Sequence, residues 1–133
     1  MEHMTRSLLF IESAPILLPL KKTLRRRDLF IFECQTAEKG LQVLRYLRFD
    51  FILIDLFIPG PVSGYDFCKK LKEDSRTKDI PLFLYSNQPL AEEIARSYFF
   101  ELKADRLIFP PFEPAHLYQQ ICFTLESGQK ETL

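Results

Sequence analysis

The segment "FILIDLFIPG", residues 51–60, contains one acidic side chain, Asp55, in an otherwise apolar run. Burying an ionised carboxylate without a charged or hydrogen-bonding partner costs free energy. A proline and a glycine follow directly, which is typical of the loop after a strand. The segment therefore predicts a buried strand over 51–55 that carries an acid at its carboxyl end.

The rest of the chain repeats this pattern of a short apolar run followed by an amphipathic stretch. Apolar runs predict four further strands, at 7–12, 29–34, 80–86 and 105–109. Apolar residues at helical spacing predict helices at 15–27, 36–49, 64–75, 90–102 and 113–127. Because proline suits only the first turn of a helix, the first regular helix is expected to begin near Pro19.

This alternation of strands and helices predicts the fold class. Near-continuous apolar strands separated by helices are typical of a parallel sheet that is covered on both faces. Right-handed crossovers then give a doubly wound α/β sandwich of five strands. Since chemistry in such sheets lies beyond the carboxyl ends of the strands, Asp55 is expected at this edge, together with Glu12, Ser86 and the residues after Phe109.

Length and charge limit the function classes. The 133 residues are expected to form one domain over 1–133, with its core at about 7–125. The 18 basic and 18 acidic residues cancel, which argues against binding to nucleic acid or to a membrane surface. The basic run "KKTLRRR", residues 21–27, is interpreted as the solvated end of a helix. Without a membrane-length apolar stretch or a signal-peptide pattern, we expect a cytoplasmic protein.

Four spaced motifs together resemble the receiver domain of response regulators, which has the flavodoxin-like (βα)5 fold. "FILIDLFIPG" is similar to the third strand, its phospho-acceptor aspartate and the proline that follows. Gly64 is similar to the glycine that opens the next helix, and "IPLFLYS", residues 80–86, to the fourth strand with its switch hydroxyl, Ser86. "ADRLIFPPFEP", residues 104–114, resembles the fifth strand and its lysine-proline-phenylalanine turn, with Pro111 and Phe112 in place.

The resemblance implies a chemistry, the transfer of a phosphoryl group from a donor to Asp55. It implies a Mg²⁺ ion held by the acids after the first strand, by Asp55 and by the backbone carbonyl of Phe57. It also implies that the Ser86 hydroxyl bonds a phosphoryl oxygen, and that a lysine after the fifth strand supplies positive charge to the same group.

This sequence departs from that set at two positions. The acid pair after the first strand reads Glu12-Ser13, so the second metal-binding carboxylate is absent, and Pro110 replaces the lysine. Losing a single electrostatic support of this kind typically costs ~100- to 1,000-fold in rate. In addition, Leu107 stands where an aromatic switch residue is common. These departures predict a degenerate receiver, or pseudo-receiver, with at most a weak Mg²⁺ site and no other cofactor.

The predicted function is a protein-interaction module of bacterial two-component signalling, and not an enzyme. The alternative is a phosphorylation-competent receiver in which Asp55 accepts the phosphoryl group, Glu12 helps to hold Mg²⁺, and the domain switches. A third hypothesis, a flavodoxin-like flavin binder, needs a hydroxyl- and glycine-rich phosphate loop. "ESAPILLP", residues 12–19, offers one serine and no glycine there.

The expected partner is a histidine kinase, an output domain or another signalling protein, with no role for nucleic acid or membrane. The resemblance implies that partners, or a second copy in a homodimer, bind the face built from the fourth helix, fifth strand and fifth helix. Phe99, Phe100 and Phe109 are the aromatic candidates for that face. The Pro110-Pro111 peptide bond is expected to be cis, which X-Pro bonds permit at modest cost.

Overall fold

The computed structural model describes residues 6–13, 17–25, 27, 29–86, 91–111 and 113–127. Its strands form one parallel sheet in the order β2-β1-β3-β4-β5. Their bounds are β1 (Arg6–Ile11), β2 (Leu29–Cys34), β3 (Phe51–Asp55), β4 (Leu82–Tyr85) and β5 (Arg106–Ile108).

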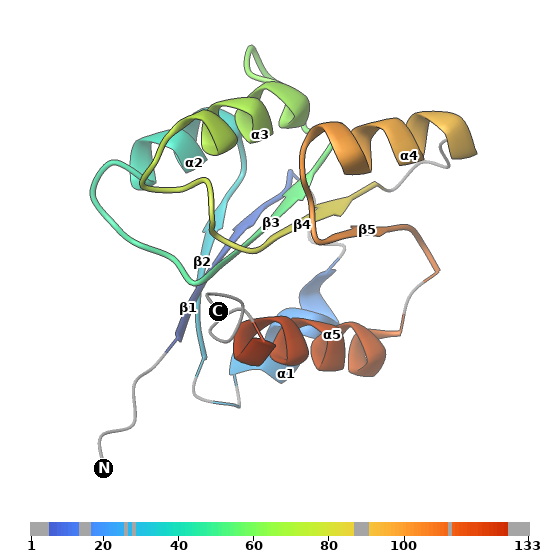
Figure 1. Cartoon of the computed structure of the whole chain (residues 1–133). Coiled ribbons are helices and arrows are strands. Elements are labelled where there is room, and N and C mark those ends of the chain that lie inside the picture. Colours follow the sequence, from blue (N-terminus) through green and yellow to red (C-terminus); the bar gives the residue numbers. More distant parts are fainter. Residues whose placement is uncertain are drawn as a thin grey trace.

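Helices cover both faces of this sheet, so the predicted doubly wound α/β sandwich is confirmed (Figure 1). One face carries α2 (Ala37–Val43), α3 (Gly64–Glu73) and α4 (Glu92–Glu101). The other carries α1 (Leu18–Arg25) and α5 (Pro114–Ser127). Among the described residues, no helix is long and apolar enough to cross a membrane.

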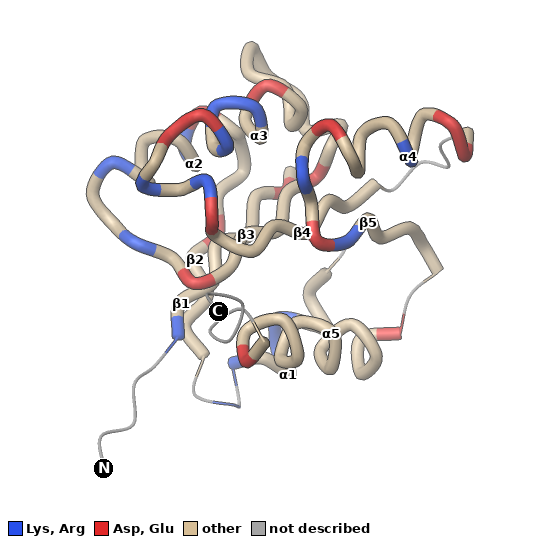
Figure 2. Tube along the Cα trace, in the orientation of Figure 1, with Lys and Arg blue, Asp and Glu red and all other residues tan. Residues whose placement is uncertain are grey.

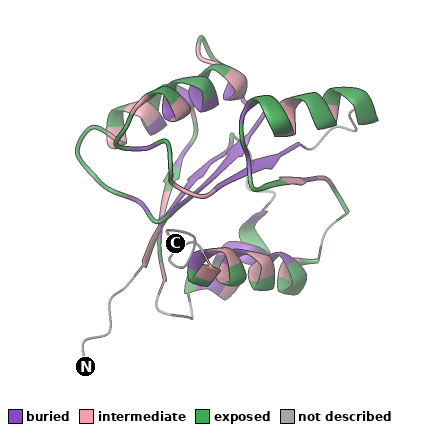
Figure 3. Cartoon of the chain, viewed as in Figure 1, coloured by how far each residue is buried: buried purple, intermediate pink, exposed green. Residues whose placement is uncertain are grey.

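The side chains of β3 contribute to two separate hydrophobic cores, because successive side chains of a strand point to opposite faces of the sheet. Ile52 and Ile54 pack into the core beneath α2 and α3, while Phe51 and Leu53 pack into the core over α1 and α5. Figure 3 shows the central strands buried and α4 largely exposed. Burial on both faces is the reason why the predicted strand over 51–55 is apolar up to Asp55.

A helix was expected over 36–49, and the predicted end was wrong, because α2 stops at Val43. Its start is capped as the sequence suggests, with Thr36 Oγ1 accepting a hydrogen bond from the Lys39 N–H at 3.1 Å. The chain then turns, and it buries Phe49 before entering β3. The spacing of apolar residues continues past the helix because this turn also packs against the core.

Two smaller expectations concern prolines. Pro19 lies in the first turn of α1, which begins at Leu18. The Pro110-Pro111 bond is cis, as expected. Phe112, the last member of the predicted turn motif, lies outside the described residues.

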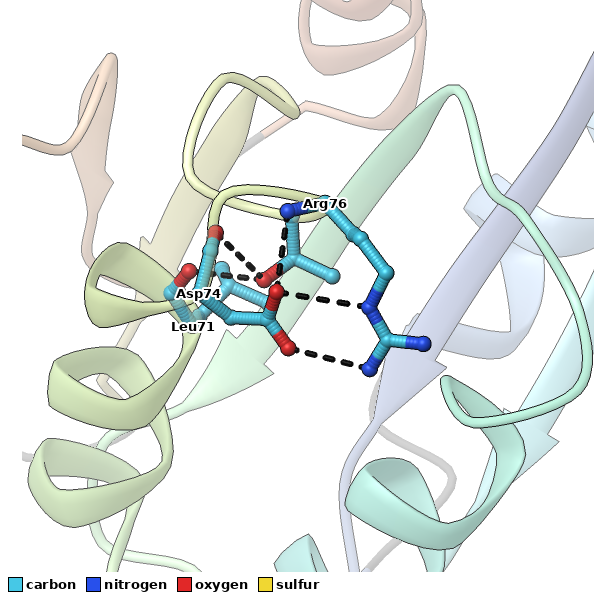
Figure 4. Close-up of polar contacts among 4 residues, drawn as sticks. Leu71, Asp74 and Arg76 are labelled. Atoms are coloured by element: carbon cyan, nitrogen blue, oxygen red, sulfur yellow. Dashed lines mark hydrogen bonds and ion pairs between the residues drawn. The ribbon is translucent and has the colours of Figure 1, made fainter.

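The connection between α3 and β4 is closed by polar contacts around Asp74 (Figure 4). Its Oδ1 accepts hydrogen bonds from the Arg76 backbone N–H at 2.9 Å and from Nε at 3.3 Å, and its Oδ2 accepts one from Nη2 at 3.0 Å. The Thr77 hydroxyl donates to the Leu71 carbonyl at 2.7 Å. Because this turn precedes β4, it lies at the amino ends of the strands. Asp55 lies at their carboxyl ends, on the opposite side of the sheet.

The start of α3 packs directly on the end of β3. A Cβ atom added at Gly64 would lie 2.6 Å from the Asp55 carbonyl oxygen and 2.8 Å from the Leu56 Cα. Only glycine allows this approach without moving backbone atoms. Ser63 caps the helix, its Oγ accepting a hydrogen bond from the Asp66 N–H at 3.0 Å. The packing of α3 therefore fixes the position of the backbone that carries Asp55.

Gly64→Ala is expected to lower the free energy of unfolding by ~1–3 kcal/mol, because the new methyl group meets backbone atoms. Gly40→Ala is the matched control within a helix. Its added Cβ would lie 2.5 Å from Ile11 Cδ1 and 3.0 Å from Phe67 Cε2, which are side-chain and not backbone atoms, so the loss should be smaller. Urea unfolding followed by circular dichroism measures both. Equal losses would contradict this account of the contact.

Candidate functional site

Three of the predicted site residues meet at the carboxyl edge of the sheet. Glu12 directly follows β1, Asp55 ends β3, and Ser86 directly follows β4. These strands are neighbours in the order β1-β3-β4, so the three residues follow one another along the edge. All three are buried, with 6% of Glu12, 6% of Asp55 and 0% of Ser86 exposed. We call this group of three residues the acid site.

Asp55 is stabilised by the turn that follows it. Its Oδ1 accepts a hydrogen bond from the Phe57 N–H at 2.9 Å, and its carbonyl oxygen accepts one from the Ile58 N–H at 3.3 Å. Burial raises the pKa of Asp55, and the Phe57 N–H acts in the opposite direction. The placement of Asp55 at the sheet edge is therefore as expected, while metal binding by the Phe57 carbonyl stays a prediction.

Glu12 is held by Lys21, the first residue of the basic run 21–27 that was expected to be solvated. Lys21 Nζ lies 2.5 Å from Glu12 Oε2, and the Lys21 side chain is only 2% exposed. Burial raises the pKa of Glu12, whereas the nearby Lys21 ammonium works to lower it. The basic run 21–27 was therefore interpreted wrongly at its first residue, which is buried and paired.

Helical spacing explains why Lys21 is buried. Leu17, Leu20 and Leu24 are fully buried in the core over α1 and α5, and Lys21 shares their side of the helix. Positions 17, 20, 21 and 24 follow the i, i+3, i+4, i+7 pattern of one helix face. This spacing was the signal in the sequence that Lys21 is buried. It was missed because the run 21–27 was judged by its positive charge alone.

A second carboxylate holds the same ammonium from the outer side. Lys21 Nζ lies 2.6 Å from Glu33 Oε1, and Arg25 Nη2 lies 2.6 Å from Glu33 Oε2. Lys21 is the foremost cause of the lowered pKa of Glu33. The four charges form a chain that runs from the buried Glu12 to the surface, and it joins β1, α1 and β2.

Ser86 and Tyr85 separate as strand alternation predicts. The Ser86 N–H donates to the Ile108 carbonyl at 3.0 Å, which ties the end of β4 to β5. Tyr85 packs into the core over α1 and α5, on the other face of the sheet. The pKa of Tyr85 is raised, first by burial and then by the negative charges of Asp55 and Glu12.

The residues at this edge do not fit a Mg²⁺ ion. Ser13 is exposed and has no carboxylate, and Glu12 is already paired with Lys21. Within the described ranges, no group of three or more His, Cys, Asp or Glu side chains lies together in a way that could hold a metal ion. Pro110, at the lysine position, is exposed and carries no charge. A divalent cation would therefore meet fewer carboxylate ligands here than the family pattern provides, and one of the two that remain is already paired with a lysine.

Comparison with known proteins agrees with the sequence motifs. The profile of the family described as response regulator receiver domain matches residues 9–122. The phosphate regulon transcriptional regulatory protein PhoB of Escherichia coli K12 is 32% identical over 119 residues, which cover 89% of this chain and 51% of PhoB. This chain spans about half the length of the curated relatives that it matches.

Two solved structures share the fold at lower identity. The CheY-like response regulator receiver domain protein of Methanospirillum hungatei JF-1 has a TM-score of 0.83 at 19% identity, covering 96% of this chain and 99% of its own. The receiver domain of sensor histidine kinase PA1611 from Pseudomonas aeruginosa PAO1 has a TM-score of 0.77 at 16% identity, covering 92% and 99%. In that structure a magnesium ion is coordinated in the active site cleft.

Lys21→Met is expected to lower the free energy of unfolding by ~3 kcal/mol or more, because it leaves the buried Glu12 without its cation. Lys22→Met removes the same charge from the exposed neighbouring position on α1 and should stay within ~0.5 kcal/mol. Urea unfolding at neutral pH compares the two variants. Adding Glu12→Gln to Lys21→Met should recover part of the loss. Similar losses for both lysine variants would contradict a buried ion pair.

Asp55→Asn is expected to stabilise the protein at pH 7 by more than the ~0.5 kcal/mol typical of neutral surface changes. The pKa of Asp55 is higher in the folded than in the unfolded chain, so the wild type loses stability as pH rises through that interval. The gain should therefore vanish below the ordinary aspartate pKa of ~3.9. Urea unfolding as a function of pH measures this trend.

Asp74 provides a control of opposite sign for the Asp55 experiment. Arg76 lowers the pKa of Asp74, so the contribution of this carboxylate is present at neutral pH and is lost on acidification. Asp74→Asn should therefore not stabilise the protein at pH 7. If both asparagine variants gained stability with the same pH dependence, burial of Asp55 would not be the cause.

Proposed function

The chain belongs to the response regulator receiver domain family, and on that premise we propose that it is an atypical pseudo-receiver, which acts by protein–protein interaction in two-component signalling. The observation that carries this proposal is the loss of charge around Asp55. Ser13 replaces a metal-binding acid and Pro110 replaces a lysine, while the remaining acid, Glu12, is held by Lys21.

Phosphoryl transfer depends on positive charge at the transferred group, because negative charge accumulates there in the transition state. At the position after β5, Pro110 has neither a charge nor an N–H group to offer. Each missing support typically costs ~100- to 1,000-fold in rate, so two losses leave little catalysis. A domain with this site is better suited to binding a partner than to a phosphorylation switch.

The surface over α4, β5 and α5 supports a role in binding. None of the α4 residues is buried, and Phe100 is 69% exposed. A hollow of about 730 Å³ lies beside α4 over β5 and the start of α5, lined by residues that include Arg96, Phe99, Leu107 and His116. Figure 2 shows charges of both signs along α4 and β5, whereas α5 is largely uncharged.

This surface is proposed to receive a histidine kinase, an output domain or another signalling protein. Phe99 and Phe109 are half-buried, and Phe99 also packs against the core, so Phe100 is the aromatic side chain most open to a partner. A homodimer through the same surface is the alternative occupant. Exposed aromatic side chains of this kind are frequent anchors of protein interfaces.

A phosphorylation-competent receiver remains the second candidate function, and one observation favours it. Asp55 and Ser86 stand at the ends of the adjacent strands β3 and β4, which is the arrangement that the family chemistry requires. In that case Glu12 would have to leave Lys21 to help hold Mg²⁺. The two candidates therefore differ in whether the acid site responds to a metal ion and a phosphoryl mimic.

The test is an amide NMR titration of the whole chain with Mg²⁺ and then with beryllofluoride, which mimics an aspartyl phosphate. The proposed function predicts no saturable shifts at Glu12, Asp55 or Ser86 beyond those of an Asp55→Asn control. Shifts that saturate at these residues and spread to α4 would instead establish the phosphorylation-competent receiver.

Phe100→Asp is expected to weaken binding to the physiological partner by ~2 kcal/mol, because a charge would replace an exposed aromatic anchor. Phe30→Asp is the matched control, since Phe30 is 53% exposed but lies on β2, at the opposite edge of the sheet. Asp55→Ala should leave binding unchanged. The measurement is the affinity of each variant for the partner, once that protein is identified and purified. Loss of binding with Asp55→Ala but not Phe100→Asp would refute the interaction role of α4.

A further inference from the structure

We propose that the Lys21 ammonium is the resident cation of the acid site, and that it keeps divalent metal ions away from Glu12. This inference rests on the proposed function. It names Lys21 as a physical cause of the weak metal binding that the proposed function assumes. The missing acid at Ser13 and the missing lysine at Pro110 are visible in the sequence. The cation supplied by α1 becomes apparent only when the chain is folded.

The contacts of Lys21 place its charge where a metal ligand would otherwise be free. Nζ lies 2.5 Å from Glu12 Oε2, so this oxygen already has a cationic partner at contact distance. A divalent ion bound to the same oxygen would lie close to the ammonium, and the two positive charges would repel each other. Metal binding through Oε2 therefore requires that Lys21 first be displaced, and an ion bound to Oε1 of the same carboxylate would still lie near the ammonium.

Displacement of Lys21 is opposed from two sides. On the outer side, Glu33 accepts the same ammonium at 2.6 Å and is itself held by Arg25. On the inner side, Leu20 and Leu24 anchor α1 in the core and keep the lysine stem on the buried face. An ammonium group suits this position because it is a compact charge with three donors, which allows it to contact both carboxylates.

The charge balance at this edge agrees with a resident cation. The acid site contains two carboxylates, Glu12 and Asp55, and Lys21 offsets one of these charges. Removing Lys21 and restoring an acid at Ser13 would leave three carboxylates with no cation between them. Carboxylate oxygens are among the ligands that a hard divalent ion prefers.

The experiment compares Mn²⁺ binding by four proteins: wild type, Ser13→Asp, Lys21→Met and the double variant. Mn²⁺ serves as the probe because its unpaired electrons broaden nearby amide NMR signals, here those of Asp55 and Phe57. The double variant should bind Mn²⁺ at least ~10-fold more tightly than Ser13→Asp alone, which is within the usual coupling between neighbouring charges. The wild type should show no saturable broadening at these amides.

Lys22→Met in the Ser13→Asp background is the matched control. It removes the same charge one residue away, from an exposed position, so it should not improve Mn²⁺ binding. Circular dichroism establishes that each variant is folded, and Lys21→Gln replaces Lys21→Met if that protein does not fold. Metal affinity is the decisive measurement because a purely structural lysine would not change it.

Equal Mn²⁺ affinities for Ser13→Asp and the double variant would overturn the proposal, as would a double variant that does not bind the ion. Saturable binding to the wild type at Asp55 would overturn it as well. Failure of the proposed function has a separate sign, namely a response of the unmodified protein to beryllofluoride. Equal Mn²⁺ affinities without a beryllofluoride response would therefore overturn the resident cation alone, whereas a beryllofluoride response would overturn both conclusions.

Discussion

The ion pair between Lys21 and Glu12 is the contact on which the proposed lack of metal binding at the acid site depends. Both side chains are buried, and a buried charge is retained only when a partner compensates for its lost hydration. The pair joins α1 to the end of β1, and Glu33 extends the link to β2. A carboxylate that resembles a metal ligand in the sequence thereby becomes part of an internal charge network.

The parallel sheet explains how the geometry of the receiver site is kept although the residues at two of its charged positions differ from the family pattern. The carboxyl ends of β1, β3 and β4 must meet at one edge, so Glu12, Asp55 and Ser86 come together whatever reaction they support. Gly64 fixes the backbone of Asp55 through packing alone. The geometry of the edge is thus maintained by the fold, whereas the charges that the family pattern implies at two positions are absent, because Ser13 and Pro110 stand there.

The sequence was sufficient to predict the fold, the ends of β3, the placement of Asp55 and the cis bond before Pro111, because each depends on local pattern or on a spaced motif. It was insufficient for Lys21, since the partners of this lysine lie 9 and 12 residues away at positions 12 and 33. A basic run is usually solvated, and although helical spacing puts Lys21 on the apolar face of α1, its two acidic partners become apparent only in the folded chain. The early end of α2 was missed for a similar reason, because the turn after it also buries an aromatic residue.

The most direct test of the resident cation is a crystal structure of the wild-type protein soaked in Mn²⁺, with the ion located by its anomalous scattering. If Lys21 is the resident cation, no manganese peak should appear beside Asp55, and Lys21 Nζ should still be in contact with Glu12. A peak coordinated by Asp55 and Glu12, with the Lys21 side chain turned away from Glu12, would contradict it. That result would show that this domain binds a divalent metal ion at the acid site.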